Sequence, residues 1–132
     1  MSRTLLAFGL VIALAALAGC RQSAQPTPTP STPVQIEFAV EPEPVTTGGA
    51  VLIITVTDEA GEPIEGAQVA ARGDMNHAGM RPVFGESTQG EQGVYWVPFE
   101  WTMGGDWFVD VTVTLPNGEA VTRRFELTVR SS

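Results

Sequence analysis

The chain has 132 residues, 7 basic and 15 acidic side chains and a formal net charge of −8, and this length suits one domain. All of the basic residues are arginines, and so acidic a surface repels phosphate backbones, which argues against a nucleic-acid partner. The single Cys and single His exclude an intramolecular disulfide and zinc sites built from several Cys or His side chains.

Residues 1–19 have the pattern of a signal peptide. Arg3 is the only charged side chain before an apolar run from Leu5 to Leu17, which is shorter than the ~20 residues of a membrane-spanning helix. The run ends in Leu17-Ala18-Gly19-Cys20, which resembles the lipobox of bacterial lipoproteins. This resemblance implies that Cys20 receives a diacylglycerol and anchors the mature protein in the cell membrane or the outer membrane, facing the periplasm or the cell exterior. The alternative is an ordinary secretory signal followed by an incidental Cys.

Residues 20–33 form a predicted linker between this anchor and the folded domain. From Gln22 onward the linker alternates Pro with Thr, Ser and other small or polar residues, so it has no side chains with which to build a core. Alternating Pro favours an extended spacer of about 3.1 Å per residue. Residues 34–132 then remain for a single domain.

A period of two governs the hydrophobic pattern from Val34 onward, which predicts strands and no helices. Leu52, Ile54 and Val56 alternate with residues of the opposite face, and Pro116-Asn117-Gly118 has the composition of a hairpin turn. Six or seven short strands in one domain predict an all-β, immunoglobulin-like antiparallel β-sandwich. The predicted strands are 34–41, 50–57, 66–73, 93–102, 107–115 and 120–130.

A cluster of soft metal ligands follows the third predicted strand. Met75, His77 and Met80 lie close together in the sequence, and thioether and imidazole groups suit copper(I) better than harder ions. If the strand continued, Met75 and His77 would project from one face. Met103, at the end of a later strand, is a fourth candidate ligand.

Packing offers an alternative explanation for the same residues. Methionine commonly fills irregular gaps in a core, and Met103 shares its predicted strand face with large apolar side chains. An isolated His at a strand end is commonly a surface residue. The carboxylates Asp74, Asp106 and Asp110 could in principle hold a harder metal, but their positions predict a solvent-exposed role.

The segment from Gly73 to Val113 resembles the YtkA-like domain, an extracytoplasmic β-sandwich of bacterial lipoproteins that is also fused to some metal-efflux proteins. The shared features are the Met/His cluster, Gly93-Val94-Tyr95 and the block Met103-Gly104-Gly105-Asp106-Trp107, followed by an alternating strand. The resemblance covers roughly residues 36–130. It implies copper as the bound metal and, as partner, a copper-accepting or copper-efflux protein. It also implies the ligands Met75, His77, Met80 and Met103.

Two tryptophans flank Met103, and their function can be read in two ways. Trp101 and Trp107 could shield a bound copper(I) ion through a cation–π contact, or they could belong to the aromatic core of the sandwich.

The function of the whole chain also has two possible interpretations. The chain is either a membrane-tethered copper-binding domain or a metal-free structural or protein-interaction module. No nucleophile motif such as Gly-x-Ser-x-Gly occurs in the sequence, so we do not expect an enzyme.

Overall fold

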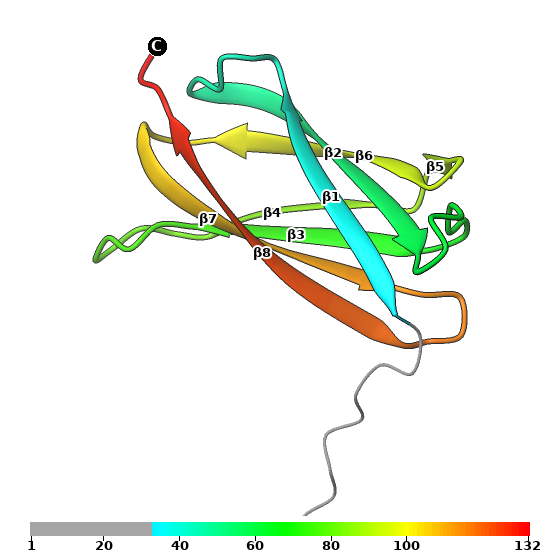
Figure 1. Ribbon diagram of the computed structural model, residues 1–132. Coiled ribbons are helices and arrows are strands. Elements are labelled where there is room, and N and C mark those ends of the chain that lie inside the picture. Colours follow the sequence, from blue (N-terminus) through cyan, green and yellow to red (C-terminus); the bar gives the residue numbers. More distant parts are fainter. Residues whose placement is uncertain (1–32) are drawn as a thin grey trace, which may run out of the picture.

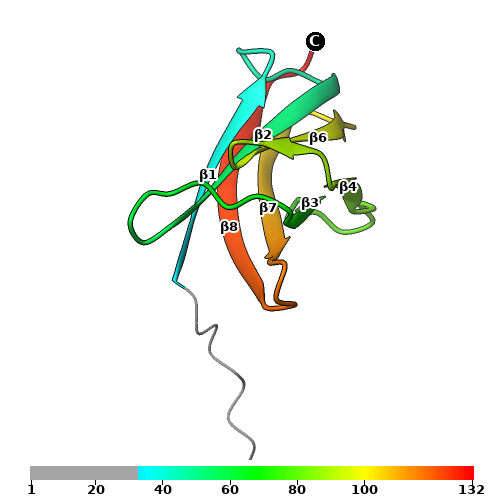
Figure 2. The same cartoon turned by 90° about the vertical axis from the view of Figure 1, so that its right-hand side faces the viewer.

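The computed structural model describes residues 33–132, so the predicted signal peptide, Cys20 and the linker up to residue 32 lie outside the described residues. Within this range the chain forms two antiparallel sheets of four strands that pack face to face (Figures 1 and 2). The first sheet has the strand order β1-β2-β6-β5 and the second has the order β4-β3-β7-β8. The predicted antiparallel β-sandwich is confirmed. The strands are β1 (Val34–Glu41), β2 (Gly48–Asp58), β3 (Gln68–Asp74), β4 (Val83–Ser87), β5 (Gly90–Glu91), β6 (Val94–Trp101), β7 (Gly105–Thr114) and β8 (Ala120–Val129).

The alternating pattern sends one face of each long strand into the space between the sheets. Leu52, Ile54 and Val56 are completely buried, and each such side chain contributes about 1.5–3 kcal/mol of burial free energy. Among residues 33–132, the buried hydrophobic residues run from Val34 to Val129 and form one core between the two sheets. No helix occurs in residues 33–132, and none there could therefore cross a bilayer.

Strands β4 and β5 are absent from the predicted set. The inward-facing position in the middle of β4 is Gly85, and a Cβ placed on it would come within 2.5 Å of the carbonyl oxygen of Pro98 in β6. Since this close approach of two backbones requires glycine, β4 lacks the buried hydrophobic side chain that marks the other strands. β5 has only two residues, which is too short for any periodicity to show.

The connections between strands gather at two ends of the sandwich (Figure 1). We call one the Val34 end, because it holds the start of β1 together with the 59–67 and 115–119 connections, and Figure 2 looks onto this side. The other is the loop end, formed by the connections 42–47, 75–82 and 102–104 and by the C-terminal residues 130–132. At the loop end, the Thr47 N–H donates to the carbonyl of Arg130 (3.0 Å), which ties the first connection to the C-terminus.

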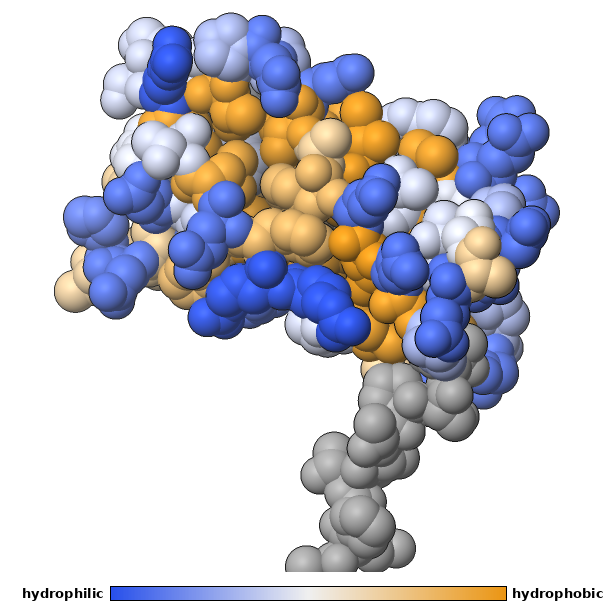
Figure 3. All heavy atoms as spheres, in the orientation of Figure 1, coloured by the Kyte–Doolittle hydropathy of each residue, from blue (hydrophilic) through white to orange (hydrophobic). Residues whose placement is uncertain are grey.

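The edge strands β1 and β8 lie next to each other across one side of the sandwich, where their sheets meet. Phe38 of β1 stacks on Phe125 of β8 with ring centroids 4.8 Å apart and an interplanar angle of 12°. Ile36 and Leu127 are also partly buried against the core. The band of hydrophobic side chains on this side of the molecule is visible in Figure 3.

Candidate metal site

The β3–β4 connection, residues 75–82, carries three of the four predicted metal ligands. β3 ends at Asp74, so Met75 and His77 lie outside the strand and the predicted shared strand face does not form. The chain turns instead at Gly79, which has a φ of 84°, and the Met80 N–H donates to the His77 carbonyl (3.4 Å). The local turn, and not strand periodicity, therefore sets where these side chains point.

Met75 lies in the hydrophobic core and not on the surface. Its exposed fraction is 4%, and its N–H donates to the carboxylate of Asp74 (2.9 Å). A Cβ placed on Gly105 would come within 2.6 Å of the Met75 Cε. The thioether therefore packs against the start of β7.

The other three candidate ligands are more accessible than Met75. The side chain of His77 is exposed, and Met80 is partly buried with one side against the core. Met103 is 46% exposed, so the alternative that placed this residue in the core is wrong. β6 ends at Trp101, two residues before Met103, and the alternation that predicted burial stops there.

Trp101 and Trp107 are buried directly beneath the connections of the loop end. They are 1% and 2% exposed, and their rings meet edge to face with centroids 5.1 Å apart. The Trp107 indole N–H donates to the Met103 carbonyl (3.0 Å), which fixes the backbone that carries the exposed thioether. The indole nitrogen of Trp101 is buried and has no hydrogen-bond partner among the described residues. Both tryptophans belong to the core, as the packing alternative predicts.

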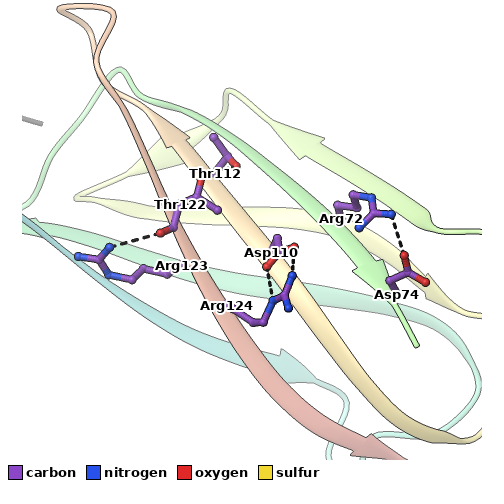
Figure 4. Close-up of polar contacts among 7 residues, drawn as sticks. All are labelled: Arg72, Asp74, Asp110, Thr112, Thr122, Arg123 and Arg124. Atoms are coloured by element: carbon purple, nitrogen blue, oxygen red, sulfur yellow. Dashed lines mark hydrogen bonds and ion pairs between the residues drawn. The ribbon is translucent and has the colours of Figure 1, made fainter. Parts of the chain in front are cut away.

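The three carboxylates considered for a harder metal are engaged in other contacts on the outer side of β3 and β7. Asp74 pairs with Arg72 (2.7 Å), and Asp106 accepts a hydrogen bond from Thr128 (2.7 Å). Asp110 receives two hydrogen bonds from the guanidinium of Arg124 (2.7 and 2.8 Å; Figure 4). These bonds hold the pKa of Asp110 below its ordinary value of 3.8. Within residues 33–132, no three His, Cys, Asp or Glu side chains come together as a metal-binding group.

The fold and this loop end define the protein as a small two-sheet antiparallel β-sandwich domain. The model of the YtkA-like family matches residues 29–112, more than half of the chain, and the chain belongs to this family. Among solved structures, the chain is similar to the soluble domain of PmoD from Methylocystis sp. and to murine CRIg. The PmoD domain is 14% identical with a TM-score of 0.46, over 71% of this chain and 90% of that one. CRIg is 15% identical with a TM-score of 0.40, over 74% of this chain and 98% of that one. No curated protein matches.

Proposed function

We propose that this YtkA-like protein is an extracytoplasmic lipoprotein that binds copper(I) at the loop end of its sandwich. The observation that carries the proposal is the placement of an exposed imidazole and an exposed thioether on two connections at the same end of the sandwich. His77 lies in the connection 75–82 and Met103 in the connection 102–104. Met80 supplies a second thioether at the boundary between the core and solvent.

The chemistry of this donor set fits copper(I). Thioether sulfur is a soft, neutral ligand, and imidazole binds copper well, whereas magnesium and calcium prefer oxygen. Met103 is not needed to fill the core, since nearly half of its surface faces solvent. We therefore assign His77, Met80 and Met103 as the ligands, and we assign Met75 to the packing beneath them.

The proposed role is to hold copper(I) outside the cytoplasm or to pass it to a copper-accepting or copper-efflux protein. An open position at the end of a sandwich suits transfer, because an accepting protein can approach ligands that are exposed. Thioether ligands also need not lose a proton before they bind metal, in contrast to thiolates.

Competition for copper(I) between the protein and a chromophoric chelator tests the assignment. We expect His77→Ala and Met103→Leu each to weaken copper(I) binding by about tenfold or more, since even residues behind the ligands commonly have effects of this size. Leucine at position 103 keeps the hydrophobic volume and removes only the sulfur. The matched control is Met75→Leu, which removes a sulfur from the core and should leave the affinity unchanged. Loss of affinity in Met75→Leu alone, with Met103→Leu silent, would contradict the proposed ligand set.

The anchor is a separate part of the proposal and has its own test. We expect Cys20 to carry the lipid, and two or three acyl chains give stable membrane attachment where one chain does not. Metabolic labelling with a fatty-acid analogue should mark the wild-type chain and not Cys20→Ala. Equal labelling of both proteins would show that Cys20 is not the attachment point.

A further inference from the structure

The outer face of the sheet β1-β2-β6-β5 carries an apolar row that nothing in the described chain covers. The strand register places Ala39 beside Ile53 and Ile53 beside Trp96, and it places Val51 beside Pro98 in the next row. Trp96 is 45% exposed, and Val51 and Ile53 are only partly buried. Isolated apolar residues on a surface are ordinary, but a contiguous row across three strands is typical of an interaction site.

Carboxylates surround this row, and no positive charge accompanies them. Glu37, Glu41 and Glu100 are exposed on the strands that carry the row, and none has an ion-pair partner among residues 33–132. The four strands of this sheet, all within the described range, contain no Arg, Lys or His. A groove of about 770 Å³ next to the row is lined by Val51 and Ile53 together with Glu41 and Glu43.

The outer face of the other sheet shows that this charge pattern is not general. There the arginines Arg72 and Arg124 lie between carboxylates and pair with Asp74 and Asp110 (Figure 4). Arg124 also lies over the ring of Phe108, with its guanidinium carbon 4.4 Å from the ring centroid. The second face therefore carries arginines that pair with two of its carboxylates, whereas the strands that carry the apolar row have no basic residue.

We propose that the outer face of β1-β2-β6 binds a basic amphipathic helix of a partner protein. A sheet buries an apolar face under another layer of secondary structure, and a helix is the element that covers a sheet face without using its edges. Apolar side chains of the helix would lie on Ile53 and Trp96, and lysines or arginines beside its apolar stripe would reach the flanking carboxylates. The exposed indole of Trp96 adds a favourable contact for such a cation. The negative charge around the row would repel an anionic lipid surface or a second copy of this acidic chain, so neither is the expected partner.

Binding of a fluorescein-labelled amphipathic helical peptide of Leu and Lys, followed by anisotropy, tests this proposal. The full chain is used in phosphatidylcholine nanodiscs without copper, with empty nanodiscs as the blank, so the result is independent of the metal site. We expect the wild-type chain to bind the peptide with micromolar affinity. Trp96→Ala should lower this affinity about tenfold or more, as for a central aromatic anchor, and Ile53→Thr should also lower it. A peptide of Leu and Glu should not bind.

Matched variants on the other sheet separate a specific site from general attraction to an acidic protein. Glu37→Gln/Glu41→Gln should weaken binding several-fold, whereas Glu86→Gln/Glu126→Gln, which removes the same charge from the opposite outer face, should stay within about twofold. Phe84→Ala removes a 70% exposed aromatic side chain and should have no effect. Equal losses in the two charge variants, no loss in Trp96→Ala and Ile53→Thr, or no binding by the wild-type chain would each overturn the proposal.

Discussion

The inner and outer layers of the loop end use the same residue types in different ways. In the inner layer, the thioether of Met75 is 4% exposed and lies with Trp101 and Trp107 in the core. In the outer layer, Met103 is 46% exposed and stands on a connection that the Trp107 indole holds in place. A methionine next to the only His in the sequence therefore serves packing, while one far away in the sequence is accessible to a ligand.

Candidate metal ligands therefore have to be separated by whether the fold places them in the buried inner layer or in the exposed outer layer. The buried thioether gains its stabilisation from contacts that a metal ion would have to displace. The exposed thioether loses few packing contacts when it binds a metal ion. Substitutions in the two layers should therefore separate stability from metal binding.

The largest expected effect is the loss of stability in Met75→Ala. Removal of a buried methionine side chain typically costs about 2–5 kcal/mol of unfolding free energy, and chemical denaturation of residues 33–132 measures it. Met103→Ala, the same change in the outer layer, should stay within about 0.5 kcal/mol. Met75→Leu keeps most of the volume and should cost less than about 1.5 kcal/mol. Equal losses in Met75→Ala and Met103→Ala would remove the distinction between the layers.

A smaller loss is expected in Gly105→Ala, which tests the contact between the two connections. Gly105 has a φ of 132°, and an added Cβ would come within 2.6 Å of the Met75 Cε. We expect the strained backbone and this contact to cost about 1–3 kcal/mol together. Shortening Met75 to Ala should relieve the contact, so the two changes should not be additive in a double-mutant cycle. Additive losses would show that the connections do not meet in this way.

Gly49→Ala is the matched control for this glycine. No atom lies within 4 Å of the Cβ that this change would add, and we expect a change within about 0.5 kcal/mol. A large loss at Gly49 would show that replacing a glycine is costly in this sandwich wherever it stands.

The sandwich could be predicted from sequence because its long strands alternate strictly. Val109, Val111 and Val113 are completely buried, and six of the eight strands lie close to their predicted bounds. β4 was missed because the backbone contact at Gly85 takes the place of a hydrophobic side chain. In β6, Trp96 points outward because it has the opposite parity to the buried Tyr95 and Val97.

The candidate metal site was harder to predict, because its residues lie in connections. Periodicity carries no information once a strand has ended. β3 ends at Asp74 and β6 ends at Trp101, each within one residue of its predicted end, so the candidate ligands that follow lie beyond both strands. The burial of Met75 depends on its contact with Gly105, a residue thirty positions away in the chain. Sequence spacing around His77 thus could not predict that Met75 is buried and that Met103 is exposed.

The position of Val34 has a consequence for how the protein would stand on a membrane. The chain enters β1 there, and the eight residues of β1, at about 3.3 Å each, run toward the opposite pole of the sandwich. The loop end, which carries His77 and Met103, therefore lies about 26 Å from the point where the chain enters β1. If Cys20 carries the lipid proposed above, the tether and the proposed metal ligands occupy opposite poles of the domain, so a partner bound at the loop end would not compete with the tether for space.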